Sequence, residues 1–232
     1  MTVKQQDFES RETLTKVLAS DIVTRLKDAI DLRDEASVAV SGGRTPIDLF
    51  QTLSQADLDW RKVTITLVDE RWVAPDDDDS NEKLVRTHLL QNNAAKAPFI
   101  PHKTSTDSPF EAEAELNKAL ARLPEMITVT LLGMGEDGHT ASFFPGADTL
   151  DKALDTEQHS DCCAVVPKTA PHPRMTLTLQ RILRSEWIVL HLTGDGKKPV
   201  LQAALGDGPV TDLPVRSVLK QNQTPVSVYW AS

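Results

Sequence analysis

Apolar positions along the chain follow two different periods. Between residues 8 and 30 they recur at the spacing of one face of an amphipathic helix. The same spacing predicts further helices at 45–53, 80–90, 110–123, 177–183 and 199–205. Short β-favouring runs predict strands at 37–40, 63–68, 126–132, 164–166, 187–192 and 226–230. Because strands alternate with helices, we expect an α/β fold with a mostly parallel, Rossmann-like sheet and helices on both faces.

The size and charge of the chain narrow its functional class. It has 232 residues, 40% of them hydrophobic, which is enough for one sizeable core, so we expect a single α/β domain over 1–232. A net charge of −9 argues against non-specific binding to nucleic acid or to an anionic membrane surface. No apolar run is long enough to cross a bilayer, and residues 1–11 are too polar for a secretory signal. We therefore expect neither a nucleic-acid nor a membrane partner.

The chain has two cysteines, Cys162 and Cys163, which are adjacent and indicate the cellular compartment in which the protein works. Adjacent cysteines rarely bridge, so we expect buried thiols and a cytoplasmic protein. Neither a CxxC nor an HExxH pattern occurs, so no dedicated metal site is expected. The acidic run at 76–79 is interpreted as a solvated loop in which Asp79 or Ser80 caps the next helix, because adjacent carboxylates do not easily converge on one ion.

A glycine turn follows the predicted strand at 37–40. After Gly42 and Gly43, Thr45 suits an N-cap and Pro46 the first helical position, so the turn should feed a helix N-terminus. The free N–H groups and the dipole at such a terminus favour an anion, and Arg44 adds a positive charge. The alternative is an ordinary strand–helix turn.

Charged residues also follow the strand at 63–68, beginning with Asp69, Glu70 and Arg71. The planar fork of Arg71 could hold a phosphate or a carboxylate. The alternative is a structural ion pair between Asp69 and Arg71, and Trp72 is interpreted as a packing residue.

The strand at 126–132 ends in a turn that contains His139. Its glycines match GxGxxG literally, but the second strand and acidic residue that a dinucleotide site needs about 20 residues further on are missing. Histidine exchanges protons near neutral pH, and Asp137 could orient its ring. The alternative is a structural histidine. Since no nucleophile elbow accompanies it, a base here would activate water or abstract a proton from carbon.

A fourth polar turn follows the strand at 187–192, where Gly194 and Gly196 precede Lys197 and Lys198. Lysine at a helix start is a counter-charge for phosphate, although both lysines could simply be solvated. Arg174, on a proline-flanked turn, adds another candidate cation. Because the carboxyl ends of parallel strands share one edge of a sheet, these four turns together predict a site for a phosphorylated small molecule.

The motifs in these turns, taken in order, resemble those of the 6-phosphogluconolactonase family. They are SGGRTP (41–46), DERWV (69–73), SN (80–81), GMGEDGHTASFFP (133–145), PRMT (173–176) and GDGK (194–197). The resemblance spans nearly the whole chain. It implies an α/β fold, hydrolysis of 6-phosphoglucono-δ-lactone to 6-phosphogluconate without metal or cofactor, and a cytoplasmic location. From the size of the chain we expect a monomer or a weak homodimer.

The resemblance also implies roles for particular residues. His139 would be the general base on a water molecule, and Asp137 would orient it. The oxyanion would be met by N–H groups near Gly42 and Gly43 or by Arg71. The phosphate and the ring hydroxyls would be held by a set that includes Asp69, Arg44, Thr45, Arg174 and Lys197.

Two alternative functions remain open for such a chain. Glucosamine-6-phosphate deaminase shares the fold, but deaminases carry a glutamate where this chain has Phe144, and usually an aromatic residue in place of Arg71. A non-catalytic sugar-phosphate sensor would carry an added DNA-binding module, for which we expect no room before the strand at 37–40.

Overall fold

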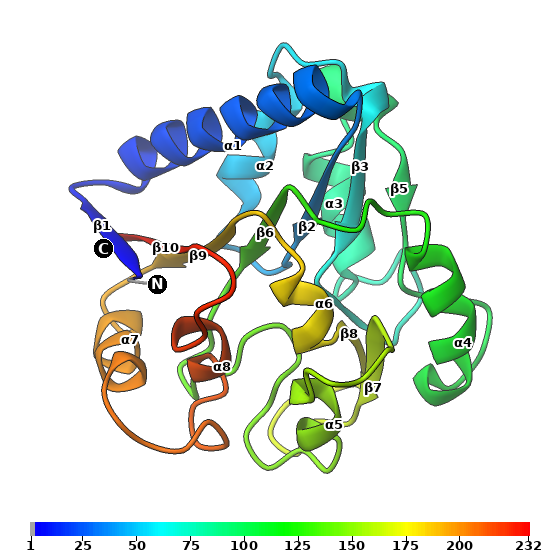
Figure 1. Ribbon diagram of the computed structural model, residues 1–232, viewed down its shortest axis with the longest axis vertical. Coiled ribbons are helices and arrows are strands. Elements are labelled where there is room, and N and C mark those ends of the chain that lie inside the picture. The colour runs from blue at the N-terminus through cyan, green and yellow to red at the C-terminus, as the bar shows by residue number, and fades with distance from the viewer. Residues whose placement is uncertain (1–2) are drawn as a thin grey trace.

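A seven-stranded parallel sheet forms the centre of the computed structural model, which describes residues 3–232 (Figure 1). In spatial order its strands are β1 (Lys4–Phe8), β10 (Val226–Ala231), β9 (Ile188–Thr193), β6 (Val129–Leu132), β2 (Ala36–Val40), β3 (Val63–Leu67) and β5 (Phe99–Ile100). Every neighbouring pair is parallel. The predicted α/β class with a mostly parallel sheet is therefore confirmed.

Helices cover both faces of this sheet, as predicted. One face carries α1 (Arg11–Arg33), α2 (Ile47–Ser54), α3 (Asn81–His88) and the 3-10 helices η1 (Trp60–Lys62) and η2 (Asn92–Lys96). The other face carries α4 (Pro109–Leu120), α5 (Leu150–Leu154), α6 (Leu179–Leu183), α7 (Lys197–Leu205) and α8 (Arg216–Leu219). Because side chains alternate along a strand, Leu131 of β6 packs in the core beneath α1, whereas Leu132 packs in the opposite core.

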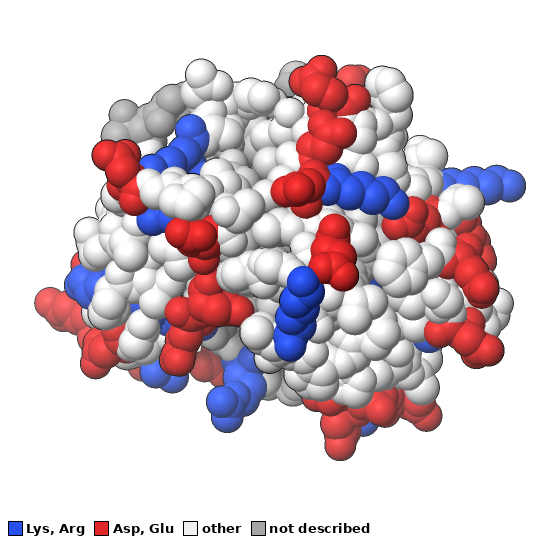
Figure 2. Space-filling view, turned by 90° about the horizontal axis from the view of Figure 1, so that it is seen from below, with Lys and Arg blue, Asp and Glu red and all other residues white. Residues whose placement is uncertain are grey.

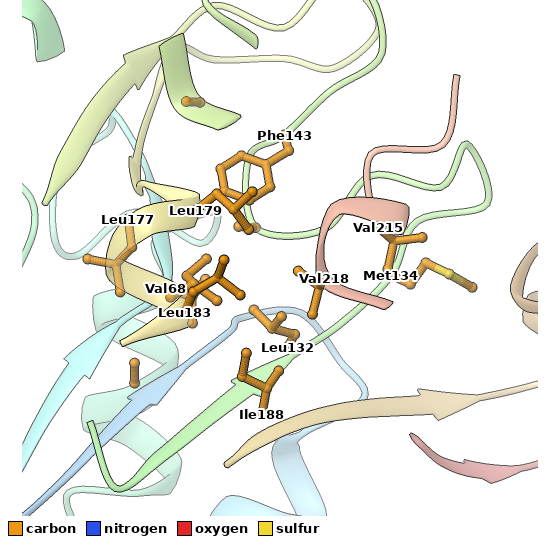
Figure 3. Packing of buried hydrophobic residues seen from close by; sticks show 14 of the residues in the cluster. Val68, Leu132, Met134, Phe143, Leu177, Leu179, Leu183, Ile188, Val215 and Val218 are labelled. Atoms are coloured by element: carbon orange, nitrogen blue, oxygen red, sulfur yellow. The ribbon is translucent and has the colours of Figure 1, made fainter. Parts of the chain in front are cut away.

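The second of these cores supports the edge of the sheet where the polar turns lie. Leu132 of β6 and Ile188 of β9 point toward Leu183 of α6 and Val218 of α8 (Figure 3). All four side chains are at most 6% exposed. Because Leu132 is the last residue of β6, this packing fixes the carboxyl end of that strand, from which the turn with His139 begins.

The pattern of apolar residues did not predict β1. Its sequence, KQQDF, faces solvent along most of its length, and it is held by its parallel pairing with β10 at the sheet edge. A strand stabilised by backbone hydrogen bonds rather than burial leaves no hydrophobic signal. Helix α1 consequently begins at Arg11, after the N-cap Ser10, and not at residue 8.

A second, three-stranded antiparallel sheet was also not expected. It consists of β4 (Asp69–Arg71), β8 (Arg174–Leu177) and β7 (Cys162–Val165) in that order. The helix predicted at 177–183 therefore begins only at Leu179, with Thr178 as its N-cap. This sheet places Arg71 directly opposite Arg174, which brings two predicted ligand-binding cations together.

Smaller expectations can also be compared with the structure. Both cysteines are free and buried, and Ser80 caps α3, as predicted. Figure 2 shows basic side chains standing among acidic ones on the face seen from below. No helix within residues 3–232 is long and apolar enough to cross a membrane. The same residues contain no group of three or more His, Cys, Asp or Glu arranged to hold a metal ion.

Candidate active site

A cleft of about 830 Å³ lies at the carboxyl ends of β2, β3, β6 and β9. The chain passes from β2 to β3 on one side and later enters β6 on the other, so the cleft lies where the strand order reverses, the usual ligand site of such sheets. It is lined by nearly all the predicted site residues: Gly42, Gly43, Arg44, Thr45, Asp69, Arg71, His139, Arg174 and Lys197. Asp137 does not line the cleft but is hydrogen-bonded to Nδ1 of His139.

The turn after β6 holds His139 in a defined orientation. Asp137 Oδ1 lies 2.5 Å from Nδ1 of His139 and also accepts the backbone N–H of His139 at 3.1 Å. The hydrogen bond with His139 lowers the pKa of Asp137 below its usual value. Gly138 has a φ of +74°, and a Cβ on Gly135 would lie 2.1 Å from the imidazole. Gly135 thus makes room for the ring, and the hydrogen bond at Nδ1 leaves Nε2 as the nitrogen able to act on a ligand.

The turn after β2 is not the helix cap that the sequence predicted. Helix α2 begins at Ile47, Pro46 occupies its N-cap position, and the cap has no side-chain hydrogen bond. The Oγ1 of Thr45 lies instead 3.3 Å from Oγ1 of Thr193 at the end of β9. Proline at the N-cap moves the helix start one residue onward, and the threonine is left to link two strand ends across the cleft.

The glycine at position 42 is required by a close neighbour. A Cβ there would lie 1.8 Å from Oδ1 of Asn81. Asn81 is itself fixed, because its Nδ2 donates to the backbone oxygen of Asp69 at 2.8 Å. The turn after β2 is thus packed directly against the start of α3.

We expect Gly42→Ala to lower the free energy of unfolding by about 1–3 kcal/mol, because Asn81 must move to relieve the overlap. Gly133→Ala is the matched control, since a Cβ there meets nothing within 4 Å. Urea unfolding of both variants and of Gly42→Ala/Asn81→Ala would measure the effect. The double variant should lose less than the sum of its single variants, and strict additivity would contradict the contact.

The strand β4 places Asp69 and Arg71 without pairing them. Asp69 accepts the hydroxyl of Ser142 at 2.6 Å, and Nη1 of Arg71 donates to the backbone oxygen of Asp79 at 2.5 Å. No ion pair joins Asp69 to Arg71 within the part of the chain that the structure describes. The alternative interpretation of this motif as a structural ion pair is therefore wrong.

Glu70, between these two residues, ties β4 to α3. Its buried carboxylate accepts the backbone N–H groups of Arg71, Asn81 and Glu82 at 2.7–2.8 Å, and the hydroxyl of Ser80 at 3.2 Å. Burial raises the pKa of Glu70 to about 7, in spite of these donors. The sequence pattern marks Glu70 only as one of three charged residues after a strand and does not predict these contacts with the start of α3.

This raised pKa makes stability depend on pH. Between the ordinary carboxyl pKa of 4.5 and about 7, the folded state keeps a proton that the unfolded state has lost. The Glu70 contribution to stability is therefore complete below pH 4.5 and is lost as the pH rises through 7. We expect the unfolding free energy to fall by up to about 3 kcal/mol over this window through Glu70 alone.

The variant Glu70→Gln, which stays neutral, should abolish that part of the pH dependence. Urea unfolding at pH 5 and pH 8 would compare it with the wild-type protein, in which all other titrating groups are the same. Equal losses in both proteins would contradict the role assigned to Glu70.

Two cations face the cleft from different elements. Arg174, at the start of β8, is 6% exposed, and its Nε is buried with no hydrogen-bond partner among residues 3–232. Burial lowers the pKa of Arg174 from its ordinary value. Lys197, the first residue of α7, donates from Nζ to the backbone oxygen of Met134 in the turn after β6. An anion in the cleft would pair with the guanidinium of Arg174 and compete for the Lys197 ammonium group.

Other lining residues were not predicted as site residues. Asn81 and Ser41 each place a buried oxygen without a hydrogen-bond partner, within the described residues, at the cleft. Phe144 contributes an aromatic ring, and His191 a buried imidazole whose pKa is lowered to about 4 by burial. Asn81 directly follows the helix-capping Ser80. In the sequence it therefore looks like an ordinary first residue of a helix, and nothing marks it as part of a site.

The chain was compared with known families and proteins. The family described as glucosamine-6-phosphate isomerases/6-phosphogluconolactonase matches residues 9–230. A 6-phosphogluconolactonase of Rhizobium meliloti (strain 1021) is 42% identical over 231 residues, which cover 100% of both chains. The crystal structure of a 6-phosphogluconolactonase from Shewanella baltica OS155 aligns with a TM-score of 0.97 at 44% identity, covering 100% of this chain and 98% of that one.

A monomeric glucosamine-6-phosphate deaminase aligns with a TM-score of 0.82, covering 99% of this chain and 97% of that one. Its 18% identity shows a shared fold only. The family match over most of the chain, together with a relative that is 42% identical over its full length, shows that the chain belongs to the glucosamine-6-phosphate isomerase/6-phosphogluconolactonase family.

Proposed function

We propose that this protein hydrolyses 6-phosphoglucono-δ-lactone to 6-phosphogluconate. The observation that carries the proposal is the placement of an Asp137-oriented His139 in the same cleft as Arg174 and Lys197. A proton acceptor and two cations in one cleft suit an ester bond and a phosphoryl group in one substrate. The full-length relatives named 6-phosphogluconolactonase support the same activity.

In the proposed mechanism, Nε2 of His139 removes a proton from a water molecule as the water oxygen attacks the lactone carbonyl. Asp137, hydrogen-bonded at Nδ1, holds the ring and stabilises the imidazolium that forms. The tetrahedral intermediate collapses by breaking the ring C–O bond, and the imidazolium returns its proton to the departing ring oxygen. Positioned acid–base catalysis of this kind typically contributes ~10²–10⁴-fold to the rate.

The negative charge on the carbonyl oxygen needs a hydrogen-bond donor. The backbone N–H groups of Gly42 and Gly43 are adjacent and have no acceptor within residues 3–232, whereas the guanidinium of Arg71 is drawn toward the backbone oxygen of Asp79 by a hydrogen bond from Nη1. We therefore assign the oxyanion to the glycine turn. The ring hydroxyls and the outer phosphate oxygens are then assigned to the remaining polar residues of the cleft, which are Asp69, Arg71, Arg44 and Thr45.

The direct test measures acid release from freshly prepared 6-phosphogluconolactone, corrected for spontaneous opening. Turnover well above the spontaneous rate is expected. Ammonia release from glucosamine-6-phosphate serves as the companion assay for the deaminase alternative, which lacks support here because Phe144 cannot relay a proton. Ammonia release without lactone hydrolysis, or tight binding without any turnover, would contradict the proposal.

We also propose that the protein works in the cytoplasm as a monomer or a weak homodimer. The two buried, unbridged cysteines support the first statement. Sedimentation over a range of protein concentrations would test the second, and a single stable oligomer larger than a dimer would contradict it.

A further inference from the structure

The imidazole of His139 is held by a second contact that the mechanism above does not use. The ring of Phe144 stacks on it, with the two centroids 4.3 Å apart and the planes at 27°. Phe144 is 3% exposed and lines the cleft beside His139. An apolar ring at this position thus lies within the site rather than only in the core.

The segment between the two residues is built to direct Phe144 toward the cleft. Thr140 and Phe143 form an isolated bridge, Ala141 has a φ of +49°, and the N–H of Phe144 donates to Ser142 at 3.1 Å. Phe143, the preceding residue, turns into the hydrophobic core (Figure 3). Both phenylalanines are buried, but only Phe144 also lies against the imidazole.

The hydrogen bond to Asp137 holds only one edge of the imidazole. Because a hydrogen bond tolerates a range of angles, it still allows a limited rotation of the ring about χ2. Contact with an aromatic face restricts this rotation, because the planes must remain close to parallel to keep the stack. The direction of Nε2 depends on both constraints together.

We propose that Phe144 is a positioning residue for catalysis, which sets the plane of His139 and so aims Nε2 at the attacking water. The inference rests on the proposed function of His139 as the base. Arg174 also approaches the Phe144 ring, with Cζ 5.7 Å from its centroid. That contact is longer than the stack on His139. Removal of the Phe144 ring should therefore lower kcat more than it raises KM.

The test compares Phe144→Leu, Phe144→Tyr and the control Phe143→Leu. Phe144→Leu keeps much of the apolar volume but removes the aromatic face, and it should lower kcat by about 10–100-fold, as expected for a misplaced catalytic group. Phe144→Tyr retains the face and should restore kcat to within a few-fold of wild type. Phe143→Leu removes a neighbouring core ring and should lower the unfolding free energy with little change in kcat.

A second measurement is independent of turnover. The ring current of Phe144 shifts the NMR resonances of the His139 ring protons, and this shift should disappear in Phe144→Leu and persist in Phe144→Tyr and Phe143→Leu. The proposal is overturned if the shift is the same in all variants, or if Phe144→Leu lowers kcat no more than Phe143→Leu does. Absence of lactonase activity in the wild-type protein would instead overturn the proposed function and leave the NMR test of the stack intact.

Discussion

Replacing His139 by alanine is expected to lower kcat by at least about a hundredfold, because the change removes the one base in the cleft that Asp137 orients. The other histidine that lines the cleft, His191, is buried, and burial lowers its pKa to about 4. The fold should be retained, since the His139 side chain is 31% exposed and belongs to a turn rather than to the core. Steady-state rates on fresh lactone, with circular dichroism as a check on folding, would measure the effect.

His159→Ala is the matched control for this experiment. His159 is exposed and does not line the cleft, so its loss should leave the rate unchanged. Asp137→Asn should fall between the two, because the amide retains a hydrogen bond to the ring but cannot stabilise the imidazolium equally. A rate for His139→Ala within a few-fold of wild type would remove this residue from the mechanism.

Replacing Lys197 by alanine is expected to raise KM for the phosphorylated lactone by about 10–100-fold, the usual loss for one charge-assisted hydrogen bond. Arg174→Ala should have a comparable effect on the same substrate. Unphosphorylated gluconolactone, which has no phosphoryl group to lose, should be hydrolysed by both variants with nearly the wild-type KM. Initial rates on the two lactones side by side would give the comparison.

Lys198→Ala supplies a control one residue away. Lys198 pairs with Asp7 on the surface and does not line the cleft, so its loss should change neither KM. Equal losses on both lactones in Lys197→Ala would mean that the phosphate lies elsewhere. An effect of Lys198→Ala as large as that of Lys197→Ala would indicate a general charge effect and not a defined contact.

Much of the central sheet follows from the sequence because its strands are buried on both faces. The runs at 63–68 and 187–192 are rich in β-branched and apolar residues, and the structure has β3 and β9 at those places. The polar turns after them could be assigned to one sheet edge by topology alone. That is why nearly all the predicted site residues line one cleft.

The rest of the site depends on contacts between residues far apart in sequence. The small antiparallel sheet sets Arg71 against Arg174, although neither strand has a strong pattern of its own. Glu70 holds the start of α3 by accepting the backbone N–H groups of Asn81 and Glu82, and no side-chain motif predicts such backbone contacts. The stack of Phe144 on His139 likewise arises from a turn whose geometry depends on a positive φ at Ala141, a non-glycine residue.

The most direct test of the central claim is a crystal structure with 6-phosphogluconate, the expected product, bound in the cleft. We expect the phosphoryl group on Arg174 and Lys197, and the carboxylate carbon close to Nε2 of His139 with an oxygen at the N–H groups of Gly42 and Gly43. A phosphoryl group bound away from both cations, or a carboxylate beyond the reach of the His139 ring, would contradict the account.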